Sequence, residues 1–227
     1  MSATCACDLE RDFDAEVAAR DLAAYRRNGL TTDQRRLLAA LLRDGVEGRT
    51  ILDIGGGIGA IHHELLRAGA SSVTDIDGSS AYLDVAKDEA RRQGHLDRIR
   101  YHHGDVVELS DGIEPADVVI LLRVLCCYPD LDGLVHASAS RARRSYGVIY
   151  PRSTWWMRAA AAAYGALRPL IGSGSGPGYV HRERDVDAAL RREGLAPVAD
   201  DSTWFWRVVL YRRTAESAGV PAVSSAA

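Results

Sequence analysis

Residues 51–60 read Ile-Leu-Asp-Ile-Gly-Gly-Gly-Ile-Gly-Ala, an apolar stretch that runs directly into a glycine-rich loop. The run Thr50–Ile54 is β-branched and apolar, as is typical of a strand buried on both faces. The glycines allow a sharp turn and leave no Cβ in the way of a ligand. Ile61–Arg67 then has the apolar spacing of a helix. A strand, a glycine loop and a helix N-terminus in this order predict a binding site for a polar or anionic group.

Two classes of protein use this arrangement. Gly55-x-Gly57-x-x-Ala60 fits a dinucleotide-binding fingerprint, whose last position accepts alanine. The longer pattern Asp53-x-Gly55-x-Gly57-x-Gly59 resembles motif I of the class I S-adenosylmethionine-dependent methyltransferases, whose loop wraps the methionine part of the cofactor. Asp53 favours the second interpretation, because a carboxylate repels a pyrophosphate and attracts the ammonium group of a methionine. A tight turn that binds no ligand is a third interpretation.

Acidic residues after the next strands extend the resemblance. The predicted strand Ser72–Asp77 ends in Asp77, about 20 residues beyond the glycines, where nucleoside-binding folds place the acid that binds a ribose. A third strand, beginning at Ile99, leads to Asp105, which the family uses for adenine, and Ala116–Leu122 is similar to the family's fourth strand. The resemblance runs from about residue 50 to residue 212. It implies that S-adenosylmethionine is bound by Asp53, Gly55, Gly56, Gly57, Gly59, Asp77, Gly104, Asp105, Val106, Leu122 and Arg123.

Three residues are candidates for catalysis. His103 and His181 are candidate bases, because histidine has the unperturbed pKa that proton removal near neutrality needs. Tyr128 lies in Cys126-Cys127-Tyr128-Pro129, which resembles the Mg-protoporphyrin O-methyltransferase branch, whose segment also ends in an aromatic residue and a proline. We expect Arg123 to pair either with an acceptor carboxylate or with a surface acid. We expect His62 and His63 to be exposed, with one of them leaning toward the cofactor as the less favoured alternative.

Strands and helices alternate between residues 50 and 150, and two further strands close the chain. The apolar spacing predicts helices over Thr32–Arg43, with Thr32 or Asp33 as the N-cap, and over Leu131–Arg143. The short link Asp200–Thr203 permits only an antiparallel pair, because a parallel pair needs a long crossover. The predicted fold is therefore α/β: a doubly wound, Rossmann-like, seven-stranded methyltransferase sheet with a terminal antiparallel strand and N-terminal helices. We expect a helical segment at 1–45, a cofactor-binding core at 46–213 with a lid-like insertion at 151–182, and a disordered tail at 214–227.

The composition is that of a globular protein. The chain has 227 residues, 47% of them hydrophobic, a net charge of -3 and no overall basic character that would favour nucleic acid. We find no signal peptide and no apolar run long enough for a membrane span, and therefore expect a cytoplasmic protein. The pairs Cys5/Cys7 and Cys126/Cys127 lack the spacing of a zinc site, so no metal is expected. Membrane contact through the helix that begins near Trp155 is a less favoured alternative to a lid.

We expect methyl transfer from S-adenosyl-L-methionine to a small-molecule acceptor by in-line displacement. The acceptor atom and the oligomeric state stay open. An NAD(P)-dependent oxidoreductase is one alternative, which Asp53, Asp105 and the terminal strand pair disfavour. A protein that binds S-adenosylmethionine without catalysis is the other.

Overall fold

The computed structural model describes residues 10–161, 163 and 178–214. Its main helices are α2 (Ala15–Asn28), α3 (Thr32–Asp44), α4 (Ala60–Arg67), α5 (Ser80–Gln93), α6 (Val106–Leu109), α7 (Leu131–Ala139) and α9 (Glu183–Arg192). Its strands are β1 (Thr50–Ile54), β2 (Ser72–Asp77), β3 (Ile99–His103), β4 (Ala116–Leu122), β5 (Ala142–Pro151), β6 (Leu195–Ser202) and β7 (Trp206–Arg213). Short 3-10 helices include η3 (Leu125–Cys127).

All seven strands belong to one sheet with the order β3-β2-β1-β4-β5-β7-β6. The strands β1 to β5 are mutually parallel, whereas β7 lies antiparallel between β5 and β6. The strand order reverses at β1: β2 and β3 follow on one side of it, and β4 and β5 on the other. Ligands bind at such a switch point, beyond the carboxyl ends of the strands. The predicted fold class is confirmed, including the terminal antiparallel pair.

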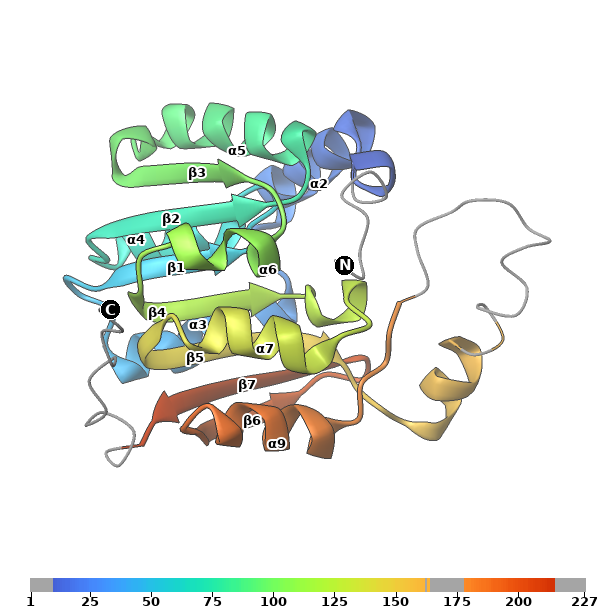
Figure 1. Ribbon diagram of the computed structural model, residues 1–227. Coiled ribbons are helices and arrows are strands. Elements are labelled where there is room, and N and C mark those ends of the chain that lie inside the picture. Colours follow the sequence, from blue (N-terminus) through green and yellow to red (C-terminus); the bar gives the residue numbers. More distant parts are fainter. Residues whose placement is uncertain (1–9, 162, 164–177, 215–227) are drawn as a thin grey trace, which may run out of the picture.

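Helices cover both faces of the sheet, with α6, α7 and α9 in front and α3 and α4 behind in Figure 1. Alternation along β1 assigns its side chains to these layers. Leu52 and Ile54 pack in the core beneath α6, α7 and α9, and Ile51 packs in the core beneath α3 and α4. Asp53 follows the same alternation as Ile51. Its carboxylate therefore faces the layer that contains α4.

Three predicted element boundaries are wrong. The link expected over Asp200–Thr203 is mostly strand, because β6 continues to Ser202 and stays paired with β7. The helix expected over Leu131–Arg143 ends at Ala139, because Ala142 already pairs with Ala116 in the sheet and β5 begins there. Thr31, rather than Thr32 or Asp33, is the N-cap of α3. Its backbone N–H donates to Gln34 Oε1 over 3.0 Å as half of a capping box.

Residues 155–161 of the predicted insertion are helical. The Trp155 side chain is 81% exposed, and the ring of Trp156 stacks on that of Trp204 with 4.8 Å between centroids. The rest of the predicted lid over 164–177 and nearly all of the predicted tail lie outside the described residues. Among the described helices, none combines the length and the apolar content that crossing a membrane requires.

Candidate functional site

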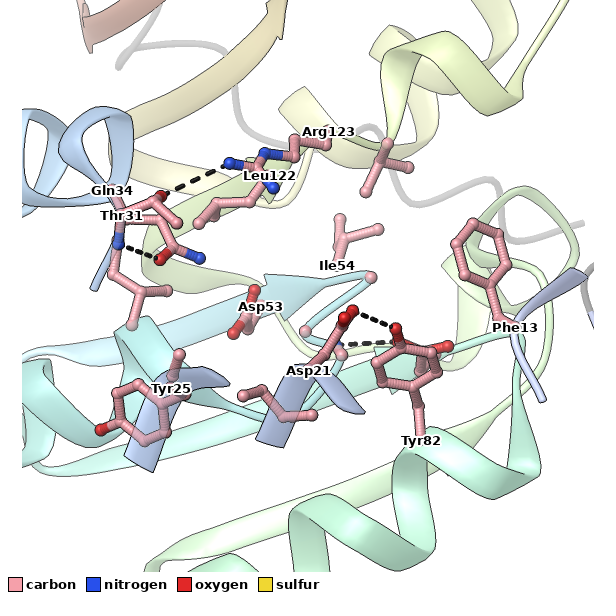
Figure 2. Close-up of a pocket in the computed structure, with 18 of the residues that line it drawn as sticks. Phe13, Asp21, Tyr25, Thr31, Gln34, Asp53, Ile54, Tyr82, Leu122 and Arg123 are labelled. Carbon is pink, nitrogen blue, oxygen red and sulfur yellow. Dashed lines mark hydrogen bonds between the residues drawn. The ribbon is translucent and has the colours of Figure 1, made fainter. Parts of the chain in front are cut away.

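A cavity of about 760 Å³ opens beyond the carboxyl ends of β1, β2 and β4. The glycine loop forms one wall, and Figure 2 shows side chains from α2 and α3 facing it from the opposite side. Nine of the residues implied in cofactor binding line this cavity: Asp53, Gly55, Gly56, Gly57, Asp77, Gly104, Val106, Leu122 and Arg123. Gly59 and Asp105 are not among its lining residues. The fold therefore brings most of the implied set to one place.

The glycine loop is held to β2 by its backbone. The N–H of Gly55 donates to the carbonyl oxygen of Ile76 over 2.7 Å. Gly57 has a φ of 57°, in the left-handed region that favours glycine, and its N–H donates to Asp77 Oδ2 over 2.9 Å. These hydrogen bonds fix the shape of the loop, whose other side faces the cavity.

Asp53 lies at the base of the cavity and is fully buried. His62 Nδ1 lies 2.9 Å from Asp53 Oδ2, and His62 is fully buried as well. No described residue is a hydrogen-bond partner of the other carboxylate oxygen, Oδ1. The expectation that His62 and His63 are exposed is wrong: α4 is covered by α3 and by the sheet, so both rings are 0% exposed.

Asp75 lies directly beneath the loop and is also fully buried. It pairs with Asp53 across the β1–β2 ladder, and its carboxylate lies against the backbone of Gly56 in the loop. Burial, and next the charge of Asp53, hold the pKa of Asp75 well above its usual value.

Asp77 closes the cavity at the end of β2. Its Oδ1 accepts from the N–H of Ser79 over 2.8 Å, and its Oδ2 accepts from Gly57. Burial raises the pKa of Asp77, and these two backbone hydrogen bonds oppose the shift. A carboxylate offers about four lone-pair sites, so both oxygens keep capacity for a ligand hydroxyl.

Asp105 is buried behind the cavity rather than in its wall. Its Oδ1 accepts from the Tyr128 hydroxyl and from the N–H of Val107, each over 2.8 Å. Tyr128 lines the cavity, and burial followed by the charge of Asp105 raises the pKa of its phenol. Tyr128 is therefore a neutral hydrogen-bond donor to Asp105. Gly104 and Val106, on each side of Asp105, present the wall itself.

Arg123 lines the cavity in a left-handed conformation, with a φ of 64°. Its guanidinium donates to Asp33 Oδ2 over 2.9 Å and lies 4.6 Å from the centroid of the Trp206 ring. Figure 2 shows it reaching Thr31, at the start of α3. Of the two partners expected for Arg123, the structure provides a protein acid. Asp33 is only 4% exposed, so this acid is not on the surface.

Neither candidate histidine lies in the cavity wall. His103 Nε2 lies 2.8 Å from Glu10 Oε1, and its side chain is 52% exposed. His181 Nε2 lies 3.0 Å and 2.8 Å from the carbonyl oxygens of Leu125 and Tyr128. His181 thus holds the segment after β4 in place. Among the described residues, no histidine lines the cavity.

The N-terminal helices contribute a wall that sequence reasoning did not identify. Its side chains include Phe13, Asp21, Tyr25, Thr31 and Gln34. Asp21 Oδ2 accepts from the Tyr82 hydroxyl over 2.6 Å, which ties α2 to α5 across the cavity. The amphipathic spacing of α2 and α3 could predict that they pack on the core, but it could not show at which edge.

The cavity has mixed charge. Asp53 and Asp77 line it beside the loop, while Arg35 and Arg123 line it toward α3 and β4. A ligand with separate cationic and anionic groups and polar hydroxyls suits this distribution. The arrangement fits binding and orientation more directly than proton transfer.

Comparison with known proteins finds methyltransferases similar to part of this chain. Residues 51–145 match the family model described as a methyltransferase domain. The ubiquinone biosynthesis O-methyltransferase of Alkalilimnicola ehrlichii (strain ATCC BAA-1101 / DSM 17681 / MLHE-1) is 39% identical over 107 residues, 47% of this chain and 42% of that protein. The match therefore spans less than half the length of this curated relative.

Solved methyltransferase structures share the fold of most of this chain. Magnesium protoporphyrin IX methyltransferase from Synechocystis PCC 6803, with bound S-adenosylhomocysteine, superposes with a TM-score of 0.73 at 21% identity, over 92% of this chain and 99% of that one. An O-methyltransferase family protein from Burkholderia thailandensis gives a TM-score of 0.64 at 17% identity, over 89% of this chain and 63% of that one. At these identities the likeness establishes the fold.

Proposed function

We propose that this chain, whose residues 51–145 match the model of a methyltransferase domain, moves a methyl group from S-adenosyl-L-methionine to a small-molecule acceptor. One observation carries the proposal. Asp53, at the base of the cavity, has a buried carboxylate oxygen with no hydrogen-bond partner among the described residues. A buried anion without a partner is costly, and the ammonium group of the methionine part supplies the missing charge.

The remaining residues fit the other parts of the cofactor. Asp77 keeps hydrogen-bonding capacity for the ribose hydroxyls, and Gly104 and Val106 form the wall beside an adenine ring. Arg123 lines the side where the methionine carboxylate is expected. Asp105 acts behind that wall, since its Oδ1 is already engaged by Tyr128 and Val107.

Bound S-adenosylmethionine supplies a methyl group on a positively charged sulfur, which makes it an electrophile. The chain must then hold an acceptor in line with that methyl group and exclude water. Tyr128 and Cys127 line the cavity after β4, and α2 and α3 cover it from the other side. His103 and His181 as bases stay predictions, and their positions favour an acceptor that needs no strong base.

A small acceptor agrees with the size and charge of the protein. The cavity of about 760 Å³ is of the size that small-molecule sites have, and the net charge of -3 disfavours nucleic acid. The name of the Alkalilimnicola relative favours an oxygen acceptor, so phenols and carboxylates are the first compounds to test.

Calorimetric titration with S-adenosylhomocysteine, with NAD and NADP in parallel, tests the proposal. We expect micromolar binding of the homocysteine nucleoside alone, and at least tenfold weaker binding by Asp53→Asn, because the charge facing the ammonium is lost. The exposed Asp132→Asn is the matched control. Binding of a dinucleotide instead contradicts the proposal. Cofactor binding without methyl transfer to any phenol, carboxylate or tetrapyrrole favours a non-catalytic binding protein.

A further inference from the structure

His62 is buried on the face of β1 that also carries Ile51, opposite to Leu52 and Ile54. It belongs to α4, immediately after the glycine loop, and both it and Asp53 are 0% exposed. Because an ionised carboxylate only accepts hydrogen bonds, the 2.9 Å contact places the proton of the imidazole on Nδ1. His62 is thus a fixed donor to one oxygen of Asp53.

This donor determines which oxygen of Asp53 is available. Oδ2 is occupied by His62, while Oδ1 has no partner among the described residues and belongs to a side chain that lines the cavity. A carboxylate held by one buried hydrogen bond cannot rotate without losing that bond. Oδ1 is therefore held ready at the base of the cavity before any ligand arrives.

Gly59 connects this pair to the loop. It is the N-cap of α4, with a φ of 77°, and its N–H donates to the carbonyl oxygen of Gly56 over 2.9 Å. A Cβ at this position would overlap Nε2 of the His62 imidazole. The last turn of the loop therefore packs directly against the His62 ring. Gly59 has no Cβ to collide with that ring, and its positive φ also favours glycine.

We infer that His62 is a positioning residue for the cofactor: it orients Asp53 toward the ammonium group and supports the loop that binds the same end. The inference rests on the proposed function. A carboxylate held in place in advance loses less freedom on binding than a free one, so the chain gains affinity specifically for a ligand that carries the ammonium.

His63 provides a matched comparison. It is the next residue of the same helix and is equally buried, but its Nδ1 lies 3.2 Å from Nδ1 of His95, away from Asp53. Burial lowers the pKa of His63 to about 3, so this ring is neutral. Replacing His63 removes an edge-on contact with the His62 ring, at 4.7 Å between centroids, but no hydrogen bond to the carboxylate of Asp53.

The experiment measures coupling between His62 and the ligand's ammonium group. S-adenosylhomocysteine and its analogue without the amino group are titrated into wild type, His62→Leu and His63→Leu. We expect wild type to prefer the amino ligand by about 10- to 100-fold, the range of a hydrogen bond to a charged group. In His62→Leu we expect the preference to fall to about threefold or less, whereas His63→Leu keeps it. A purely structural defect weakens both ligands alike.

Two further variants decide the case if His62→Leu does not fold. Asn places its amide nitrogen where Nδ1 of the imidazole lies, while Gln displaces it by one bond. We therefore expect His62→Asn to keep the preference and His62→Gln to lose it. A full preference in His62→Leu or in His62→Gln overturns the inference and leaves the proposed function intact. Absence of S-adenosylhomocysteine binding to wild type overturns the proposed function, and the inference with it.

Discussion

The Tyr128 hydroxyl donates a 2.8 Å hydrogen bond to the buried carboxylate of Asp105. This bond joins the segment after β4 to the segment after β3, on two sides of one cavity. Tyr128 lines the cavity and Asp105 does not, so the tyrosine lies between the acid and the ligand space. Two residues that the sequence analysis assigned separately, Tyr128 to catalysis and Asp105 to adenine binding, are thus joined by one hydrogen bond.

Tyr128→Phe removes the donor and leaves Asp105 Oδ1 with fewer partners in a buried position. We expect the free energy of unfolding to fall by about 0.5–1.5 kcal/mol, the usual net contribution of one hydrogen bond, because the N–H of Val107 still donates to Oδ1. Urea denaturation measures it. Tyr82→Phe is the control: its partner Asp21 has a side chain that is 44% exposed, so water replaces the phenol and the loss is smaller. If both variants lose the same unfolding free energy, the buried Tyr128–Asp105 hydrogen bond is no stronger than the more exposed Tyr82–Asp21 bond.

Asp77→Ala removes the predicted ribose ligand and also the acceptor of the Gly57 N–H. We expect S-adenosylhomocysteine to bind more weakly by about 1.5–3 kcal/mol, the range of hydrogen bonds to a charged group. Asp77→Asn keeps one acceptor oxygen for the loop and is expected to lose less. Calorimetry on both variants, checked for folding by circular dichroism, tests this. Unchanged affinity in a folded Asp77→Ala protein rejects the placement of the ribose.

Gly59→Ala places a methyl group against the His62 imidazole in a backbone conformation that favours glycine. Gly94→Ala, at a φ of 71° with open space around its Cα, is the matched control. Backbone strain of about 1–2 kcal/mol applies to both. We expect only Gly59→Ala to destabilise further and to weaken cofactor binding. Thermal melting and calorimetry measure the two effects, and identical behaviour of the variants contradicts the contact.

Asp75→Asn tests the buried acid beneath the loop. Burial, and next the charge of Asp53, raise the pKa of Asp75 in the folded protein, so the folded state keeps a proton that the unfolded chain loses above about pH 4. The contribution of Asp75 to stability is therefore fully present below that pH and is lost as the pH rises through its folded pKa.

We expect Asp75→Asn, which cannot ionise, to gain stability relative to wild type as the pH rises from 4 through neutrality. The measurement is denaturant unfolding of both proteins across that range. Tyr101 on β3, Asp77 on β2 and the Asp53–His62 pair all face the same region, so the comparison is made at constant ionic strength. A difference between the proteins that does not vary with pH contradicts a protonated Asp75.

Arg123→Met removes the partner of Asp33, an acid that is only 4% exposed. We expect the free energy of unfolding to fall by about 1–3 kcal/mol, since a buried charged acceptor loses its donor. Adding Asp33→Asn is expected to restore part of the loss. Arg184→Met, whose partner Asp185 is exposed, changes stability by less than about 1 kcal/mol. Additive losses from Arg123→Met and Asp33→Asn in a double-mutant cycle contradict a direct pair.

Local pattern predicted much of this architecture. β1, β2 and β4 have the predicted bounds. For β1 and β4 the signal was a largely apolar run bounded by glycine or polar residues, which is typical of a buried parallel strand. The antiparallel pairing of β6 with β7 followed from the short link between these two strands, since a parallel pair needs a long crossover. The sequence by itself thus determined the sheet, the glycine loop and the family pattern that marks the cavity.

Only the tertiary structure decided which side chains face that cavity. His62 is buried because α4 packs between α3 and the sheet. Arg123 has a hydrogen-bond partner because Asp33, 90 residues away in sequence, lies beside it in the first turn of α3. The wall from α2 is likewise positioned by Tyr82 and Asp21, which are 61 residues apart. Periodicity describes one element at a time, whereas these contacts depend on how distant elements pack. For that reason the sequence identified the loop but not the residues that support and cover it.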